Sequence, residues 1–548
     1  MTIPATVQDV IMARVDCLPQ EMKSLLQTLS AVGRESSYDL IKRVTGLTEQ
    51  KLLSHLSVLK DSELLYERGI YPQSTYIFKH ALTQDVAYDS VLLKRRKEIH
   101  EGIGRAMEAQ YPDRLEEHYE LLAYHYGHSA NADKAVQYLD LANQKAAKLN
   151  AMEEAKAYFD EAMELLDALP ETEENRQRRI SLLANQGIVF FLLLRHPEYY
   201  DLLTRYEPTA RDLGNPELLG AFYARLGHCE YSFGNYDQSI KTFGKAAKLC
   251  QVAGNTEETG YIYVFCGASH LDRGDYDRVL ALKEDVLRTM EQQFNLRFHT
   301  YALSAASRAY ACLGRWDESV EEAQKALSAA AEFSDNSLIS FIAWNLSIAY
   351  SWKGDLARAV ECGELAAEKA PTPVDKAFAQ RSLGWAWCRS GETTRGIEFL
   401  TTVLPILRAG RFIPTEIPLM CFLGEGYWMA GEKDKARQTL EKGLEMAERY
   451  GARYELGFAH RLLGEISLKN NPAEAAPRFE KSIAIFQEIK AENELAMAYA
   501  GYGRLHKKQG EITRAREYLA KAMEIFERLA TPIEPNKVRE VLAKLPEA

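Results

Sequence analysis

The side chains that most often perform chemistry are scattered along this chain rather than grouped. Its 12 histidines and 8 cysteines form no HExxH and no CxxC, the spacings that metal and redox sites use. There is no GxSxG nucleophile turn, no dinucleotide-binding GxGxxG and no GxxxxGK[ST] phosphate loop. Paired carboxylates such as Glu116 and Glu117 fall at helix starts, where they favour the helix dipole. We therefore expect no catalytic residue, no cofactor and no metal.

The strongest pattern is an internal repeat, which sets the elements that must position any functional residue. A small residue recurs every 37 to 40 residues, at Gly187, Gly227, Gly267, Ser307, Ser347, Gly384, Gly424, Gly464 and Gly503. A turn residue, usually Gly, follows seven residues later in almost every unit. Each unit predicts two helices, because Gly ends a helix by entering the left-handed region. One such pair cannot bury its apolar stripe alone, so the units must stack into a solenoid.

These units resemble the tetratricopeptide repeat. They share its small residue, the aromatic residue three later as at Tyr310, the turn Gly, and the later pair Ala515 and Leu519. The period here is about 40 residues, against 34 in the family. The resemblance covers residues 170–530 and implies an α-α solenoid. Upstream, three less regular helices are predicted at 116–128, 133–148 and 151–166.

The resemblance also implies which residues face a partner. In such repeats the first-helix positions three before, one after and four after the small residue point into the concave groove. Here those positions hold Tyr231, Arg308, Trp344, Arg381, Trp385, Glu425, Trp428, Arg461, Glu465 and Arg504. Arg and Trp dominate binding hot spots, so we expect a protein or peptide ligand. The alternative for each single residue is an ordinary packing or solvated position.

The first 110 residues do not share the period. Helices are predicted at 9–15, 20–32, 38–44 and 49–61. Two short alternating strands, LLYERG and TYIFK, follow around a turn that contains Pro72. Helix, turn, helix and a two-stranded wing is the layout of a winged helix. The fold class we expect is mainly α: a winged helix over 1–110, irregular repeats or a cap over 111–170, a superhelix over 171–530, and a tail over 531–548.

A winged helix raises the question of DNA. Its second helix carries Lys51, His55 and Lys60 among acidic residues, whereas base-reading helices bring Arg, Lys, Asn or Gln with flanking phosphate contacts. The run 94–97 (KRRK) reads as a solvated face. The net charge of -11 gives no overall attraction to nucleic acid. We do not expect DNA as a partner.

The amino-acid sequence of this segment resembles the region after the ATPase core in bacterial signal-transduction ATPases with numerous domains. The matching stretches are IPATVQDVIMARVDCLP, LLYERG, FKHALTQDVAYDSVL and RRKEIHEGIGRAME. The resemblance covers about residues 1–165 and implies the order ATPase, winged helix, helical sensor, often fused to adenylate or guanylate cyclase. It places the ATPase core before Met1, so we expect the chain to be either part of a longer protein or a stand-alone sensor that lacks the ATPase core.

One residue carries over from this resemblance. His80, between the second strand and the next helix, resembles the winged-helix histidine that contacts ADP in this superfamily. An imidazole on a phosphate would couple nucleotide state to domain placement. The family's acidic neighbour is replaced by Ala81, and without a phosphate loop His80 would need an ATPase domain in cis or trans. A histidine bonded locally at a strand end is the alternative.

Composition places the chain among ordinary folded proteins, with 46% hydrophobic and 26% charged residues. The N-terminus lacks a signal-peptide layout, and the longest apolar run, 187–194, is too short to span a bilayer. Unpaired cysteines suit a reducing compartment, so we expect a cytoplasmic protein.

The function we expect is a non-catalytic signalling scaffold that relays ligand binding through the winged helix. Two alternatives stay open: the regulatory part of an ATPase or cyclase, and a winged-helix transcription regulator.

Overall fold

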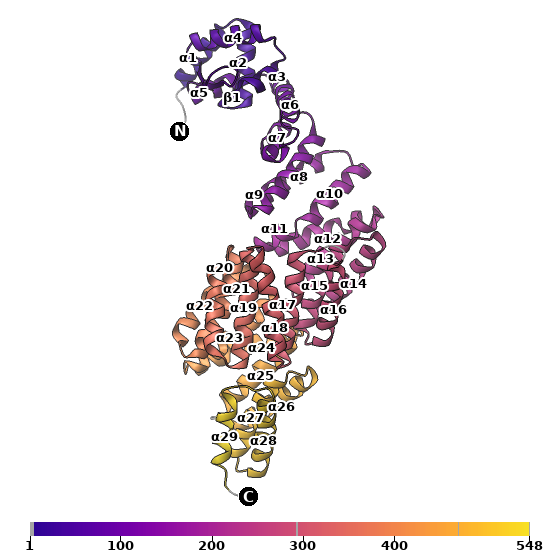
Figure 1. The fold of residues 1–548 in the computed structure, drawn as a ribbon, viewed down its shortest axis with the longest axis vertical. Coiled ribbons are helices and arrows are strands. Elements are labelled where there is room, and N and C mark those ends of the chain that lie inside the picture. The colour runs from indigo at the N-terminus through magenta and orange to yellow at the C-terminus, as the bar shows by residue number, and fades with distance from the viewer. Residues whose placement is uncertain (1–4, 292–293, 469–470, 547–548) are drawn as a thin grey trace. The chain divides into compact units, whose positions relative to one another are not determined.

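The computed structural model describes residues 5–291, 294–468 and 471–546, and over these the chain is mainly α-helical (Figure 1). It divides into two compact units, Met1–Asn175 and Arg176–Ala548. Every helix in the described ranges is too short or too polar to cross a bilayer.

The N-terminal unit begins with helices around a small antiparallel sheet of strand order β1-β3-β2. Its elements are α1 (Ala5–Asp16), α2 (Gln20–Val32), β1 (Glu35–Ser37), α3 (Tyr38–Thr45), α4 (Glu49–Asp61), β2 (Leu65–Arg68), β3 (Thr75–Phe78), α5 (Ala81–Asp89) and α6 (Leu93–Gln110). The four predicted helices and both predicted strands are present. Strand β1 was not predicted, because its sequence ESS has no strand propensity and its pairing of Ser36 with Tyr76 is a tertiary contact.

Local signals set the ends of these elements. Ser37 caps α3 by accepting a hydrogen bond from the Leu40 N–H at 3.4 Å, and Gly46 ends that helix in the left-handed region at φ 61. The core beneath them is aliphatic and aromatic, with Leu26, Leu52 and Phe78 almost fully buried. The same chemistry that predicted the helices from sequence thus fixes their ends.

The N-terminal unit continues as helices without a sheet. These are η1 (Leu115–His118), α7 (Tyr119–Gly127), α8 (Ala132–Lys148) and α9 (Met152–Ala168), followed by α10 (Glu173–Asn185), which runs across the boundary between the units. The three helices predicted upstream of the repeats are confirmed, the first of them opening as a 3-10 turn.

The C-terminal unit is a solenoid of antiparallel helix pairs (Figure 1). Its helices are α11 (Gly187–Leu192), α12 (His196–Asp212), α13 (Pro216–Ser232), α14 (Tyr236–Ala253), α15 (Thr256–Asp272), α16 (Tyr276–Met290), α17 (Leu296–Cys312), α18 (Trp316–Glu332), α19 (Asn336–Lys353), α20 (Leu356–Lys369), α21 (Pro373–Ser390), α22 (Thr393–Ala409), α23 (Ile413–Met429), α24 (Lys433–Tyr450), α25 (Arg453–Ser467), α26 (Pro472–Glu488), α27 (Glu492–Lys508), α28 (Ile512–Arg528) and α29 (Glu534–Ala543). The odd-numbered helices from α13 to α27 are the first helices of their pairs. The expected mainly α solenoid is confirmed, and the segment 531–548 contains the additional helix α29.

The repeated residues act as the pattern indicated. A Cβ on the small residue Gly503 would lie 2.7 Å from Leu519 Cγ, so the two helices of that pair approach too closely for a larger side chain. A second signal also repeats: the side chains of Asn215, Asn255, Asn295 and Asp335, 40 residues apart, each cap a first helix.

The core of the C-terminal unit is continuous through its interior, from Tyr236 on α14 to Ala498 on α27. Early and late repeats therefore share side-chain contacts rather than touching only their neighbours. Trp352 of α19, for example, has its ring 5.0 Å from that of Tyr454 on α25. A strictly linear repeat array has no such contacts.

Candidate ligand-binding face

The first-helix positions predicted to face a partner lie inside the C-terminal unit. Five of them are buried: Trp344, Arg381, Trp385, Glu425 and Arg461. The other five are half-buried: Tyr231, Arg308, Trp428, Glu465 and Arg504. None is freely exposed, so the inner side of the repeats is covered by other parts of the same unit.

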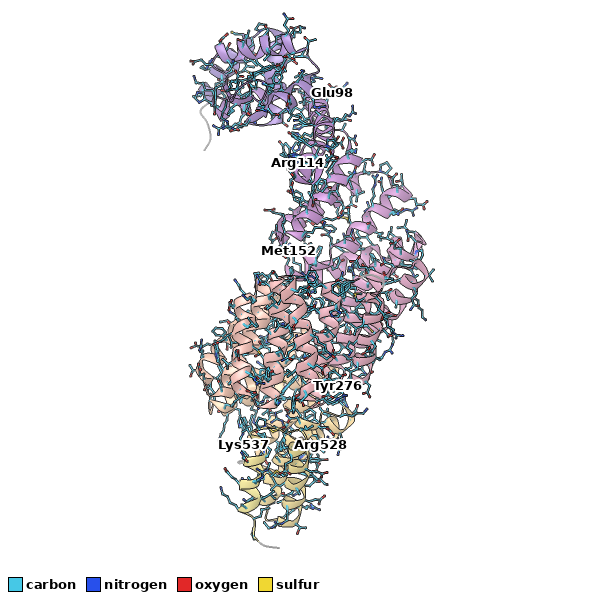
Figure 2. All side chains as sticks on the ribbon, in the orientation of Figure 1. Glu98, Arg114, Met152, Tyr276, Arg528 and Lys537 are labelled. Carbon is cyan, nitrogen blue, oxygen red and sulfur yellow. The ribbon has the colours of Figure 1, made fainter. Side chains whose placement is uncertain are left out.

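Charged side chains from four first helices meet in this interior. We call Asp272, Arg308, Arg381 and Glu455 the ionic cluster; they come from α15, α17, α21 and α25. Asp272, Arg308 and Glu455 line a cavity of about 10 Å³, room for roughly one water molecule. Tyr276, at the start of α16 and labelled in Figure 2, also lines the cavity.

The ionic cluster is incompletely satisfied. Arg381 is 1% exposed, yet its Nε and Nη2 have no hydrogen-bond partner. Its guanidinium carbon lies 4.9 Å from the centre of the Trp344 ring, a cation–π contact. Nε of Arg308 and Oδ2 of Asp272 are likewise without a partner. Buried polar groups are normally paired, so this cluster is a site where further polar atoms would be stabilising.

Burial also shifts the proton affinities of the cluster. Burial, reinforced by the neighbouring charge of Arg308, lowers the pKa of Arg381 to about 9. Burial raises the pKa of Asp272 to about 7, although the charge of Arg308 opposes the shift. The pKa of Glu455 is raised for the same reason. Groups with such shifts respond strongly to a charged ligand or to solvent entry.

A second group of the predicted residues is paired across neighbouring first helices, although Arg461 Nη2 is also buried without a hydrogen-bond partner. Trp385 stacks on Phe422 with ring centres 4.1 Å apart and donates from Nε1 to Glu425 Oε2 at 2.7 Å. Arg461 Nε donates to Glu494 Oε2 at 2.8 Å, with both side chains at most 3% exposed. Glu465 pairs with Arg504. These residues hold neighbouring first helices together, which is a packing role.

Comparison with known proteins identifies the repeats. The tetratricopeptide repeat family matches residues 221–252 and residues 495–530. The chain contains tetratricopeptide repeats. The first match covers most of α13 and α14, and the second covers most of α27 and α28. No curated protein matches the sequence.

The chain is also similar to several solved structures at low identity. A Rap protein complexed with competence and sporulation factor is 12% identical, with a TM-score of 0.42 over 73% of this chain and 99% of that one. A signal-transduction ATPase with a tetratricopeptide repeat sensor from Pyrococcus horikoshii is 14% identical, with a TM-score of 0.36 over 99% and 68%. The human IFIT1 dimer with PPP-AAAA is 16% identical, with a TM-score of 0.39 over 71% and 90%.

Sequence reasoning missed the acidic members of the inner side. Glu258, Asp375, Glu455 and Glu494 each lie nine residues before the small residue of their own tetratricopeptide repeat. Glu258 and Glu494 pair with Arg225 and Arg461, in each case 33 residues earlier on the preceding first helix. The period that predicted Arg461 also indicates Glu494, which lies nine residues before the small residue of its repeat where Arg461 lies three before.

The remaining predicted residues lie apart from the ionic cluster or at its edge. Tyr231 packs near Phe412 with ring centres 6.3 Å apart, and Trp428 packs on the central core. His80 lies in the other unit, exposed, at the N-cap of α5, and its side chain makes no capping bond. In the described ranges no three His, Cys, Asp or Glu side chains group as a metal site requires.

Proposed function

We propose that this protein is a non-catalytic signalling scaffold that binds a protein or peptide on the inner side of its tetratricopeptide repeats. Solenoids of this kind use their inner, concave surface for recognition. The chain has matched repeats at both ends of the array, and its inner side carries Arg, Trp and Glu. Arg and Trp side chains are enriched at the residues that dominate binding energy in protein interfaces, so this inner side suits recognition of a partner.

The observation that carries the proposal is the unpaired guanidinium of Arg381. Two of its nitrogen atoms are buried without a partner, beside Trp344 and the similarly incomplete Arg308. Carboxylates are the group that a guanidinium fork binds best, through two parallel hydrogen bonds. The ligand we propose is therefore a peptide that presents an Asp, a Glu or a C-terminal carboxylate to Arg381.

The test is a selection from a random peptide display library against the full chain, followed by affinity measurements on the enriched peptides. Arg381→Met removes the guanidinium but keeps most of its length, and a buried unpaired charge is lost, so the fold should be retained. Losing a buried charged hydrogen bond costs about 2 kcal/mol or more. We expect affinity to fall by about 30-fold or more.

The matched control is Arg358→Met on the second helix α20, whose side chain is 61% exposed. Affinity for the same peptides should not change in this variant. A selection without preference for acidic residues, or equal binding to the Arg381→Met protein, would overturn the assignment. Trp385 is unsuitable for this test, because it is 0% exposed and its removal would cost about 3–5 kcal/mol of stability.

We propose further that the N-terminal unit relays ligand binding to an ATPase or cyclase domain, in cis or in trans. The order α2, β1, α3, α4, β2, β3 supports a winged helix, and the exposed imidazole of His80 is available to a nucleotide held by such a domain. Ligand binding should change amide hydrogen exchange in residues 5–110 of the full chain. If exchange there is the same with and without a selected peptide, the relay is wrong.

A further inference from the structure

We propose that the C-terminal unit is held closed by a latch between early and late repeats, and that the inner side becomes accessible only when this latch opens. The latch consists of the turn glycines Gly234, Gly274 and Gly314 together with the side chains of Tyr450, Ile489 and Leu529. Access of a ligand rests on the function proposed above, whereas the closure itself does not.

The glycine contacts define the latch. A Cβ placed on Gly234 would lie 2.7 Å from Tyr450 Cδ1, and one on Gly274 would lie 2.7 Å from Ile489 Cγ2. A Cβ on Gly314 would lie 2.8 Å from Leu529 Cδ1. The register is regular: each turn between a first and a second helix receives an apolar side chain from the end of a later second helix, and a Cβ on Gly234 would also lie 2.9 Å from Ile413 Cγ2. The later repeats therefore use the absence of side chains at these turns.

The same turn in later repeats has no such contact. Gly391, Gly431 and Gly510 also have a positive φ, as the latch glycines do, yet a Cβ on any of them would meet nothing within 4 Å. A helix-ending turn alone therefore does not require this crowding. The contact belongs to the repeats over which the chain has wound back.

Polar contacts join the same two parts of the chain. Lys490 Nζ donates to Asp277 Oδ2 at 2.8 Å, across 213 residues of sequence, and both side chains are largely exposed. Asn493 Nδ2 donates to the Trp352 carbonyl oxygen at 3.4 Å. Exposed ion pairs contribute little to stability, so the Lys490–Asp277 pair adds little to the apolar contacts at the glycines, whereas the Asn493 hydrogen bond is buried.

Closure covers the ionic cluster. The cavity is lined from early repeats by Asp272, Arg308 and Cys312, and from a late repeat by Tyr454 and Glu455. Its volume of about 10 Å³ admits roughly a water molecule and no peptide side chain. Closure also leaves the guanidinium of Arg381 unpaired, which opposes the closed state. The continuous apolar core holds the closed state, and the buried charge of Arg381 opposes it, so a ligand that pairs with Arg381 would favour opening.

Gly274→Asn tests the latch, with Gly431→Asn as its matched control. Asn tolerates the left-handed conformation better than other residues with a Cβ, and the two glycines have φ +78 and +83. The backbone cost is thus nearly equal in the two variants, while only the side chain introduced at Gly274 would overlap Ile489. Overpacking of this kind shifts an equilibrium by about tenfold or more.

The readout is the rate of alkylation of single thiols in the full chain, followed by mass spectrometry. Cys312 is 5% exposed and lines the cavity, whereas Cys250 is 0% exposed between adjacent helices. Burial raises the pKa of both thiols to about 12, so both are protonated thiols while they stay buried. Cys312 should react about tenfold faster in Gly274→Asn than in Gly431→Asn, with Cys250 unchanged.

A second variant and a second measurement complete the experiment. Ile489→Ala should also accelerate Cys312, and Gly274→Asn should add little to it, because the overlap is gone. Zero-length carbodiimide coupling of Lys490 to Asp277 should proceed in the native protein and fall in both variants. Equal Cys312 rates in Gly274→Asn and the control overturn the latch. Parallel acceleration of Cys250 in both Gly274→Asn and Ile489→Ala overturns it too. None of these measurements uses a ligand, so failure of peptide binding leaves the latch standing.

Discussion

At the scale of single residues, the N-terminal unit contains a buried pair of histidines, His100 and His125, which no sequence motif predicts because they lie 25 residues apart. His100 Nδ1 lies 3.0 Å from His125 Nδ1, and the Tyr88 hydroxyl lies 2.9 Å from His100 Nε2. Burial lowers the pKa of His100 to about 4 and that of His125 to about 3, and the charge of His128 adds to both shifts. Both rings are therefore neutral at pH 7, and one donates to the other.

This pair should make the N-terminal unit sensitive to acid. Both pKa values lie below the ordinary value of about 6.5 in the unfolded chain, so the unfolded state binds more protons and stability falls as pH drops. The loss should begin near pH 6.5 and approach about 1.4 kcal/mol per pH unit for each histidine, ending near the folded values. Denaturant unfolding at pH 7 and pH 5 measures it.

Replacing one ring isolates the contribution of the pair. His125→Gln should reduce the difference in unfolding free energy between pH 7 and pH 5. His80→Gln, at an exposed position, should leave that difference unchanged. An unaltered pH dependence in His125→Gln would show that the pair does not control acid sensitivity.

At the scale of elements, neighbouring first helices are joined by charged pairs across the repeats. Arg225 on α13 forms two hydrogen bonds with Glu258 on α15, at 3.0 and 2.6 Å. The guanidinium carbon also lies 4.1 Å from the centre of the Tyr261 ring, and Arg225 Nε donates to the Ala184 carbonyl at 2.9 Å. The two side chains are only 13% and 15% exposed, so each depends on the other.

Breaking this pair should be costly. Arg225→Ala leaves the Glu258 carboxylate nearly buried and unpaired, and we expect a loss of about 3 kcal/mol in unfolding free energy. Arg225→Met with Glu258→Leu should recover most of it. The control is Arg528→Ala on α28, labelled Arg528 in Figure 2, which breaks an exposed two-bond pair with Glu492 and should cost at most about 1 kcal/mol. Equal losses in the two single variants would contradict the role of burial.

At the scale of the C-terminal unit, closure links repeats that a linear array would leave independent. In a linear array, removal of terminal repeats affects mainly the nearest neighbours. Here α25 and α27 supply Tyr454, Glu455 and Asn493 to the region around α16, α17 and α19. Removing late repeats should therefore also destabilise the early repeats that they contact.

A truncated chain ending at Gly451 tests this coupling. It lacks Ile489 and Leu529 but keeps Ile413 and Tyr450, the contacts of Gly234. Amide hydrogen exchange around Gly274 and Gly314 should accelerate, because their contacts are gone and the inner side is opened to solvent. Exchange around Gly234 should change much less. Uniform exchange at the three turns would argue against closure as the source of protection.

Much of the fold follows from the sequence because it depends on contacts between residues close along the chain. The turn at Gly431, the cap at Ser37 and the period of the small residues all act within one helix or one pair of helices. The positions of Arg381 and Arg461 on the inner side follow from that period too. Winged-helix identity, the role of His80 and the domain limits at 110, 170 and 530 stay predictions.

Tertiary structure alone decided what covers the inner side. Strand β1 exists because Ser36 meets Tyr76, not because its own residues favour a strand. The contact of Gly274 with Ile489 depends on small rotations between repeats that accumulate along the array. Those rotations arise from side-chain packing between successive first helices, which no local pattern encodes. The sequence by itself therefore determined the repeats and the residues they present, and only their cumulative packing buried those residues and left two nitrogen atoms of Arg381 without a hydrogen-bond partner.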